Sequence, residues 1–333
     1  MNAFFKGAAA AALALSLGTA AHAAETTEIN FGIISTESQQ NLRPQWDPFL
    51  EAMEKATGLK VNAFFASDYA GVIEGMRFGK VDAAWFGNKS AMEAVDRSDG
   101  EVFAQTVDVD GNPGYWSLLL AHKDSPINSL DDVLKCDKSL NFGIGDPNST
   151  SGFLVPTTFI FAKNGVDPKT CFKTVRNANH ETNALAVANG QVDVAANNTE
   201  NLARIEKTNP KAFANIKVIW KSPLIPADPI VWNKKLDQAT KDKLYTFFMS
   251  YGRLGSPEQV AMARKVLSGL AWAPFKPSSD AQLYPIRVMA LTKDMFKIKA
   301  DDKFSDEEKA AKLKELAVEK AKYEKLMETI PQV

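Results

Sequence analysis

Three consecutive hydroxyl side chains, Ser149, Thr150 and Ser151, lie between an apolar segment and a helical one, within the sequence GIGDPNSTSG at residues 143–152. A helix start presents unpaired N–H groups and a partial positive charge, so it can hold an anion without a cation. Hydroxyl donors suit a tetrahedral oxyanion. Ser and Thr at a helix start more often only cap the helix. The segment therefore indicates an oxyanion site only if other polar groups join it.

Five further residues have the types that would complete such a site. His180 lies between a strand and a helix, where it offers a donor at a second helix start, and Tyr69 and Tyr115 each lie at a junction of elements. Glu200 and Asp228 are carboxylates in apolar surroundings. Taken singly, each is more often an ordinary surface or capping residue. Donors together with a separate carboxylate pair indicate a ligand that is anionic at one end and cationic at the other.

Catalytic motifs are absent from the sequence. His180-Glu181 begins like H-E-x-x-H, but Ala184 stands where the second histidine should be, and no other histidine pair has metal-ligand spacing. There is no G-x-S-x-G elbow and no Walker loop. Residues 143–145 open like a dinucleotide fingerprint but lack its third glycine. We therefore expect no enzyme, no metal site and no cofactor.

Composition and charge narrow the class of protein. The 333 residues are 45% apolar and 24% charged, as in an ordinary soluble globular protein of about two domains. The formal charge is −1, from 39 basic and 40 acidic residues. Nucleic-acid binding is not expected, because it usually requires a basic surplus or patch.

The first 23 residues have the pattern of a secretory signal peptide. Lys6 precedes an apolar run at residues 7–17, and Ala21-His22-Ala23 is an A-x-A cleavage site. The apolar run is too short to remain as a membrane anchor. We expect an exported protein that is cleaved after Ala23.

Two cysteines, Cys136 and Cys171, each precede a predicted strand. In an oxidising compartment an even number of cysteines permits one disulfide bond, and neighbouring strand starts would bring these two together. Two free buried thiols are the alternative.

Strands alternate with helices along the chain, which predicts an α/β fold with parallel sheets covered by helices. The predicted strands are residues 29–34, 61–66, 81–85, 116–121, 140–143, 172–175 and 192–195. The segment GKVDAA at residues 79–84 recurs as GQVDVA at residues 190–195, each time after an amphipathic helix. Two similar lobes joined by crossing strands would explain this repeat, and coincidence is the alternative.

The C-terminal segment predicts a long charged helix that begins with a capping box at residues 305–308 and ends near Thr329. Its apolar stripe consists of Leu313, Leu316, Tyr323 and Met327. Such a stripe usually packs on its own lobe. The alternative is contact with a second copy, which would give a weak homodimer through this helix.

Over essentially the whole mature chain, the sequence resembles the phosphonate-binding periplasmic proteins, which are the solute receptors of phosphonate ABC importers. The most specific stretches are FGIISTES at 31–38, AGVIEGMRF at 70–78, DPNSTSGF at 146–153 and HETNAL at 180–185. The resemblance implies a type II binding-protein fold, in which two lobes close on a ligand in the cleft. Each lobe would hold a mixed, mostly parallel sheet flanked by helices. We expect residues 24–115 and 116–228 to form the two lobes, and residues 229–333 to return to the first lobe and add the C-terminal helices.

In that family the helix-start hydroxyls hold the phosphonate group together with two tyrosines and a histidine, and two acids meet the amino end of 2-aminoethylphosphonate. The matching residues here are Ser149, Thr150, Ser151, Tyr69, Tyr115, His180, Glu200 and Asp228. The resemblance therefore implies a periplasmic receptor that delivers phosphonates to the permease of an ABC transporter at the inner membrane. A receptor for another oxyanion, such as phosphate or phosphite, is the alternative.

Overall fold

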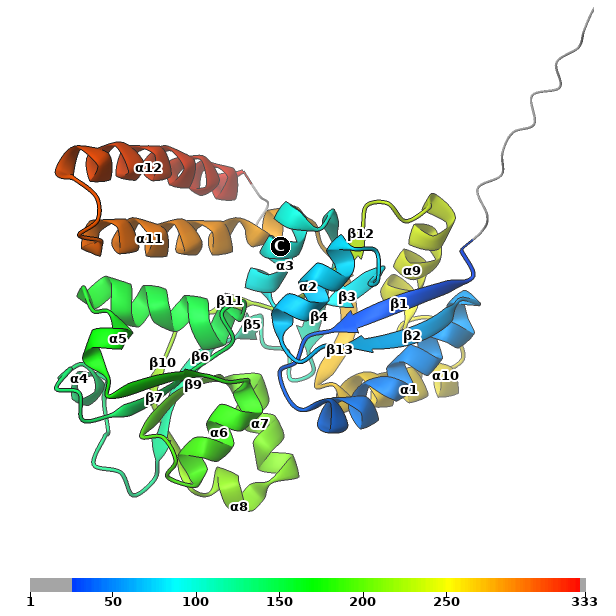
Figure 1. Ribbon diagram of the computed structural model, residues 1–333. Helices are drawn as coiled ribbons and strands as arrows, with labels where there is room; N and C mark the ends of the chain where they lie inside the picture. The colour runs from blue at the N-terminus through cyan, green and yellow to red at the C-terminus, as the bar shows by residue number, and fades with distance from the viewer. Residues whose placement is uncertain (1–25, 330–333) are drawn as a thin grey trace, which may run out of the picture.

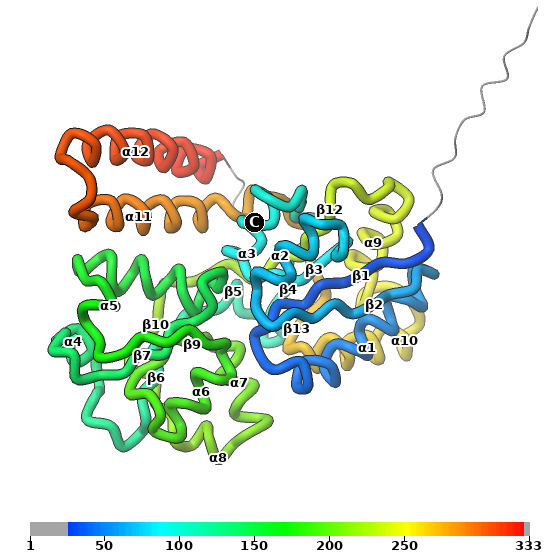
Figure 2. The backbone as a smooth tube through the Cα atoms, viewed as in Figure 1, coloured from blue at the N-terminus to red at the C-terminus, as the bar shows by residue number. Residues whose placement is uncertain are grey.

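The computed structural model describes residues 26–329, which form two α/β lobes side by side (Figure 1). The chain builds most of the first lobe, crosses to the second, and returns to the first (Figure 2). The expected signal peptide and its cleavage site at Ala23 lie outside the described residues. Within residues 26–329, no helix is long and apolar enough to cross a membrane.

The first lobe contains a mixed sheet between two layers of helices. In spatial order its strands are β13 (Trp272–Pro277), β4 (Gly100–Asp108), β12 (Pro229–Asn233), β3 (Ala83–Trp85), β1 (Glu28–Ile33) and β2 (Lys60–Phe65). Helices α1 (Gln39–Thr57), α9 (Gln238–Ser250) and α10 (Pro257–Gly269) pack together on one face, and α2 (Tyr69–Arg77) and α3 (Asn88–Arg97) pack on the other. Large aromatic side chains such as Trp46, Phe49 and Phe248 fill the core of this lobe.

The second lobe repeats the plan on a smaller scale. Its strands, in spatial order, are β10 (Ile216–Lys221), β6 (Ser117–His122), β9 (Val194–Asn198), β7 (Asn141–Ile144) and β8 (Thr174–Asn177). One face carries α4 (Leu130–Val133), η1 (Thr150–Leu154), η2 (Thr157–Phe161), η3 (Ala162–Asn164) and α5 (Pro168–Cys171). The other face carries α6 (His180–Ala188), α7 (Thr199–Thr208) and α8 (Pro210–Phe213).

The expectation of mostly parallel sheets needs a correction. Strands β2, β1 and β3 run parallel, as do β8, β7 and β9, but the remaining pairs of both sheets are antiparallel. The antiparallel half of each sheet includes the strand that follows a crossing between lobes, β6 or β12. A strand that enters from the other lobe is not joined to its neighbour by a strand–helix–strand connection, and that connection is what makes neighbouring strands parallel.

The repeated segments occupy equivalent places in the two lobes. Gly79 and Gly190 both have left-handed backbone angles, with φ of 67° and 66°. Asp82 accepts a hydrogen bond from the amide of Asn30 at 2.8 Å, and Asp193 accepts one from the amide of Asn141 at 2.7 Å. Each aspartate therefore ties a helix–strand turn to the neighbouring parallel strand, which explains why these letters recur.

Two extended segments cross between the lobes and pair with each other. Strand β5 (Gly114–Tyr115) is antiparallel to β11 (Ile225–Pro226). A Cβ atom on Gly114 would lie 2.0 Å from the carbonyl oxygen of Ile225, so only glycine allows this approach. Tyr115 thus lies in the hinge between the lobes, and Asp228 lies just after the second hinge strand, β11.

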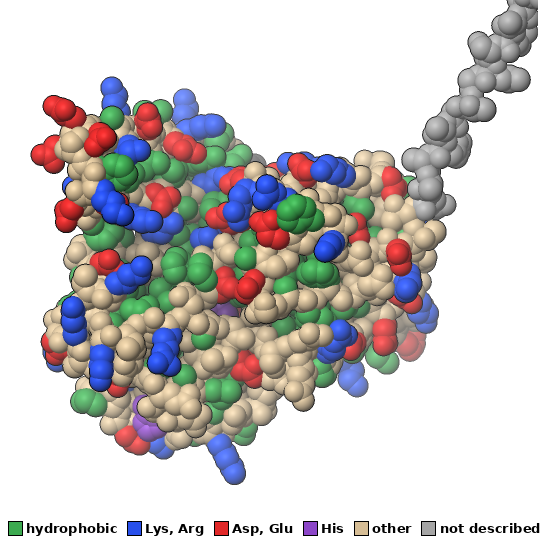
Figure 3. All heavy atoms as spheres, viewed as in Figure 1, with side chains coloured by type: hydrophobic (Ala, Val, Ile, Leu, Met, Phe, Trp, Pro, Cys, Tyr) green, Lys and Arg blue, Asp and Glu red, His purple; other side chains and the backbone are tan. Residues whose placement is uncertain are grey.

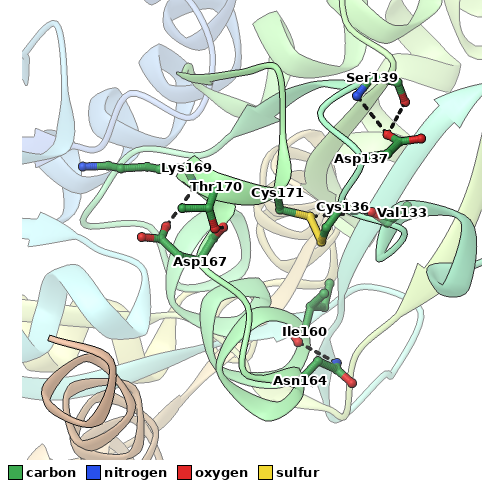
Figure 4. The surroundings of a disulfide bond; sticks show 10 residues. All are labelled: Val133, Cys136, Asp137, Ser139, Ile160, Asn164, Asp167, Lys169, Thr170 and Cys171. Atoms are coloured by element: carbon green, nitrogen blue, oxygen red, sulfur yellow. Dashed lines mark hydrogen bonds between the residues drawn. A yellow bond between two sulfur atoms is a disulfide. The ribbon is translucent and has the colours of Figure 1, made fainter. Parts of the chain in front are cut away.

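Cys136 and Cys171 form a disulfide bond that joins the segment after α4 to the end of α5 (Figure 4). The two cysteines precede β7 and β8, which are neighbouring parallel strands. The bridge therefore closes the outer edge of the second sheet, far from the crossing segments.

The chain ends in a helical hairpin above the second lobe (Figure 1). After the short helix η4 (Asp280–Leu283), α11 (Tyr284–Ala300) contacts helices of both lobes, and α12 (Asp306–Glu328) packs along α11. Ser305 and Glu308 form the predicted capping box. Of the predicted stripe, Leu313, Leu316 and Tyr323 are half-buried, and the Tyr323 ring lies 5.7 Å from that of Tyr284 on α11.

Candidate functional site

A cavity lies at the seam between the lobes, and it is lined by all eight residues that the sequence analysis selected. Tyr69 comes from the first lobe, Ser149, Thr150, Ser151, His180 and Glu200 from the second, and Tyr115 and Asp228 from the hinge region. Acidic side chains are visible along this seam on the surface (Figure 3). Lining residues stand at or beside the first residue of the helices α2, η1, α6 and α7, so several helix N-termini converge on one space.

The hydroxyl segment opens a helix with unusually wide turns. The amide of Leu154 donates to the carbonyl of Ser149, an i→i+5 bond, at 3.1 Å. Such a turn leaves one more N–H group unpaired at its start than an α-helix does. The turn also packs directly against the end of β7, because Gly145 and Gly152 have no side chains. A Cβ on Gly145 would lie 2.6 Å from the Cα of Gly152.

Each hydroxyl oxygen in this segment already accepts a hydrogen bond from the protein. Ser149 Oγ accepts from the amide of Gly152 at 3.0 Å. Thr150 Oγ1 accepts from the amide of Lys89 in the opposite lobe at 2.8 Å. Ser151 Oγ accepts from Nδ2 of Asn198 at 3.0 Å. Because the oxygens are engaged as acceptors, the three hydroxyl protons remain available to donate into the cavity.

His180 adds a neutral imidazole to the same group of donors. Its Nε2 lies 3.4 Å from Ser149 Oγ and 3.5 Å from Ser151 Oγ. Burial lowers the pKa of His180 to about 4. The side chain is therefore uncharged at neutral pH and contributes hydrogen bonds rather than a positive charge.

The two tyrosines face the cavity from the other side. Burial raises the pKa of both Tyr69 and Tyr115 well above the usual 10, and nearby carboxylates, including Asp228, raise it further. Both phenols therefore keep their protons. Tyr115 donates its proton to Oδ1 of Asp228 at 2.9 Å, which fixes the orientation of that carboxyl group in the hinge.

Glu200 and Asp228 place two acids in the same cavity, and both have raised pKa values. Burial raises the pKa of Glu200 to about 7, with a further contribution from Asp108, while the positive charge of Arg204 opposes the rise. Asp228 is only 6% exposed. Burial and the charge of Glu200 raise its pKa well above the usual range. A cation between these carboxylates would allow both to ionise.

Some cavity residues were not selected from the sequence. Asn198, the N-cap residue of α7, connects Ser151 with His180, whose Nε2 lies 3.3 Å away. Trp46, Trp85 and Trp272 form an apolar wall, with ring centroids 5.3 to 5.8 Å apart. The three tryptophans are far apart in the sequence and carry no motif. Asn198 lies three residues after the repeated segment at residues 190–195, and this position is a signal that the sequence offers.

The residues present fit a small polar ligand better than a metal. Within the described residues, no group of three or more His, Cys, Asp or Glu side chains could hold a metal ion. Several buried polar atoms that line the cavity lack a hydrogen-bond partner among these residues: Thr36 Oγ1, His180 Nδ1 and Asn201 Oδ1. Unsatisfied buried polar atoms of this kind are expected where a ligand or ordered water binds.

Two α/β lobes joined by paired crossing strands, with a polar cavity at the seam, define a type II periplasmic binding protein. A family model described as the periplasmic substrate-binding protein of phosphonate ABC transporters matches residues 31–283. The chain therefore belongs to the phosphonate-binding periplasmic proteins, the substrate-binding components of ABC phosphonate transporters. It is a binding protein and not an enzyme.

Individual relatives agree with this assignment. The chain is 61% identical over 297 residues to the phosphonates-binding periplasmic protein of Escherichia coli, which covers 89% of this chain and 86% of that protein. The crystal structure of the binding-protein component of an ABC phosphonate transporter from Pseudomonas aeruginosa matches with a TM-score of 0.87 and 57% identity, over 91% of this chain and 99% of that one. A phosphate-import protein of Mycolicibacterium smegmatis is 33% identical over 274 residues, covering 78% of this chain and 84% of that protein.

Proposed function

We propose that the phosphonate bound by this protein carries an amino group, as 2-aminoethylphosphonate does, and that the cavity recognises both ends of the ligand. The observation that carries the proposal is the presence, in one cavity, of hydroxyl donors at a helix start and of two acids with raised pKa values. The donors suit an oxyanion and the acids suit a cation. Only a ligand with both groups satisfies the whole cavity.

The phosphonate group would bind at the start of η1. Ser149, Thr150 and Ser151 donate their hydroxyl protons, and the unpaired N–H groups of the wide first turn add further donors. Tyr69 stays protonated and can donate from the facing side, whereas the proton of Tyr115 is held by Asp228. Hydrogen bonds to a charged acceptor in a desolvated cavity are roughly twice as strong as those between neutral groups.

The ammonium group would bind between Glu200 and Asp228. Its positive charge would favour the ionised form of both acids and so oppose the burial that raises their pKa values. The neighbouring tryptophan wall excludes water from this end, and aromatic rings also attract a cation over their faces. A ligand without an ammonium provides no charge to pair with these acids, and ionising a buried carboxyl group without a partner costs several kcal/mol.

A receptor for phosphate or phosphite is the second candidate, and the 33% identical phosphate-import protein supports it. Such a ligand would use the same hydroxyl donors but would gain nothing from Glu200 and Asp228. An anion without a cationic end would also be repelled by these acids once they ionise.

Calorimetric titration with 2-aminoethylphosphonate, methylphosphonate, phosphate and phosphite separates the two candidates. We expect 2-aminoethylphosphonate to bind with a micromolar or lower Kd, and phosphate to bind at least ~100-fold more weakly, a difference of ~2.7 kcal/mol. Equal affinities for the two would refute the proposal.

Export and assembly complete the proposed function. We propose that the chain is cleaved after Ala23 and that the closed form is recognised by the permease. Mass spectrometry of the exported protein tests the cleavage site. A mass that corresponds to a chain beginning at any residue other than Ala24 contradicts it. A homodimer through α12 stays a proposal. Sedimentation of the ligand-free protein at micromolar concentration tests it, and a purely monomeric boundary would exclude it.

A further inference from the structure

One rim of the cavity is closed by polar contacts between the lobes, some made by residues that line the cavity and some by residues that do not. The segment at residues 36–41 of the first lobe, which leads from β1 into α1, lies against the starts of α6 and α7 in the second lobe. Residues 36–38 and 180–181 belong to stretches that stand out in the sequence, and among them Thr36, Glu37 and His180 line the cavity whereas Ser38 and Glu181 do not.

The first contact is a capping arrangement that spans the two lobes. Helix α1 begins after Ser38, whose side chain accepts from the amide of Asn41 in the usual way. In an ordinary capping box, the residue at Asn41 would reach back to the amide of Ser38. Here Glu181 of the opposite lobe accepts from the Ser38 amide at 2.9 Å and also accepts from the side-chain amide of Asn41.

The second contact is a partly buried ion pair beside the first. Glu37 is only 5% exposed, and its Oε1 lies 2.9 Å from a guanidinium nitrogen of Arg204 on α7. The side-chain amide of Asn201 lies 3.5 Å from the same oxygen. Among the ion pairs of the described residues, this carboxylate is the most buried, so separating the pair requires both groups to be hydrated again.

Both contacts are carried by the helices that also hold the ligand-facing residues. Glu181 follows His180 on α6, and Arg204 lies one turn after Glu200 on α7. On the facing side, α1 carries Trp46 of the tryptophan wall. Closure that brings the ligand-facing residues together therefore also forms these two contacts, whatever phosphonate is bound.

We propose that Glu181 and the Glu37–Arg204 pair form an interlobe latch that sets the affinity for all phosphonates by the same factor. The latch residues act as positioning residues. They stabilise the closed form relative to the open form, and the observed affinity is the intrinsic affinity of the closed form multiplied by its population. This inference rests on the proposed closure around the ligand, but not on the amino group of the ligand.

The test compares Glu181→Ala and Asn41→Ala with Glu74→Gln as a matched control. Glu181→Ala removes both acceptor oxygens of the capping contact, and Asn41→Ala removes one donor from an exposed position that does not face the cavity. Glu74 pairs with Arg77 at 3.5 Å on the surface of the first lobe, within one helix. Each variant is titrated with 2-aminoethylphosphonate and with methylphosphonate, and ligand release is followed by stopped flow.

We expect Glu181→Ala to weaken both ligands by the same factor, about 10- to 100-fold, as expected for the loss of charge-assisted hydrogen bonds. Asn41→Ala should weaken both by a smaller common factor, and Glu74→Gln should change neither. The loss should appear mainly as faster ligand release, and the melting temperature of the empty protein should stay close to that of the parent.

Two results would overturn the latch. Unchanged affinity for both ligands in Glu181→Ala would show that the contacts contribute nothing to closure. Unequal losses for the two ligands would show that Glu181 senses the ligand itself. If Glu181→Ala lowers the melting temperature, Asn41→Ala decides, because its side chain is exposed. The two proposals can fail separately. If the parent protein shows no preference for 2-aminoethylphosphonate, but the variants lose affinity for both ligands equally, the proposed ligand is refuted and the latch is retained.

Discussion

The pair Glu200 and Asp228 offers the most direct test of how the cavity selects its ligand. The substitutions are Glu200→Gln and Asp228→Asn, which remove a charge and keep the shape. Asp228→Asn retains the oxygen that accepts from Tyr115 at 2.9 Å, so the hinge should stay intact. The expected effect is a large loss of affinity for 2-aminoethylphosphonate and no loss for methylphosphonate, which has no ammonium group.

The magnitude follows from the burial of the two acids. A carboxylate and an ammonium about 4 Å apart attract each other by ~4 kcal/mol at an effective dielectric constant of 20. Desolvation of the ammonium offsets part of this attraction, and hydrogen bonds to charged groups contribute ~1.5–3 kcal/mol net. Each substitution should therefore weaken 2-aminoethylphosphonate about 10- to 150-fold. Methylphosphonate should bind as well as before or slightly better, because a negative charge that repels it has gone.

The assay is calorimetric titration at pH 8, where Glu200, with its pKa of about 7 in the empty protein, is mostly ionised. Melting curves of the empty variants serve as the control. Because ionisation of a buried carboxyl group costs stability, Glu200→Gln should not lower the melting temperature at this pH. Equal losses for both ligands would show that the acids support the fold rather than bind the amino group, and would refute the reasoning.

Three further results are expected. Thr150→Ala combined with Ser151→Ala should abolish both the binding of 2-aminoethylphosphonate and the ligand-induced decrease in radius of gyration seen by small-angle scattering, while leaving the empty protein folded; retained binding would contradict the role of the hydroxyls. Between about pH 4.5 and 7 the raised pKa of Glu200 keeps a proton on the empty protein, so the stability of the empty protein should fall as pH rises through this window. Binding of 2-aminoethylphosphonate near pH 6–7 should release protons from the protein. Calorimetry in buffers of different ionisation enthalpy measures this release, and Glu200→Gln should reduce it. Thiol labelling of the denatured, unreduced protein should find no free thiol, and reduction should destabilise it by up to ~4 kcal/mol for a loop of this length; two reactive thiols would exclude the bridge.

Much of the fold could be predicted because its strands are short apolar runs between helical segments. The errors have identifiable causes. The first helix is predicted by apolar residues at helical spacing from Trp46 onward, but α1 begins at Gln39, because Ser38 caps it and Pro44 lies inside the helix. No strand was expected at β4, although it pairs with two neighbours. Polar residues interrupt its pattern, and one of them, Gln105, is buried and donates to the carbonyl of Ala227 beside the hinge.

Some residues of the candidate site could be predicted from the sequence, and others could not. Ser149, Thr150 and Ser151 could be found from their position between a strand and a helix, because the carboxyl ends of parallel strands bring such segments to one edge of a sheet. The roles expected of the tyrosines and the acids came from the resemblance to a family. The tryptophan wall and the interlobe latch could not be predicted, since they exist only once two separately folded sheets have been brought together.

In the proposed binding mode, uncharged donors hold the anionic end of the ligand at neutral pH. The histidine in the cavity is neutral, the phenols keep their protons, and the hydroxyl oxygens are already engaged as acceptors. Uncharged donors discriminate by position rather than by net charge, and this leaves the two carboxylates free to attract a cation in the same cavity. An arginine or lysine in the phosphonate position would instead have paired with those carboxylates in the empty cavity. Because Thr150 is oriented by the amide of Lys89 from the opposite lobe, this set of donors is complete only when the lobes are closed. We therefore expect recognition of the ligand and closure of the lobes to be one event.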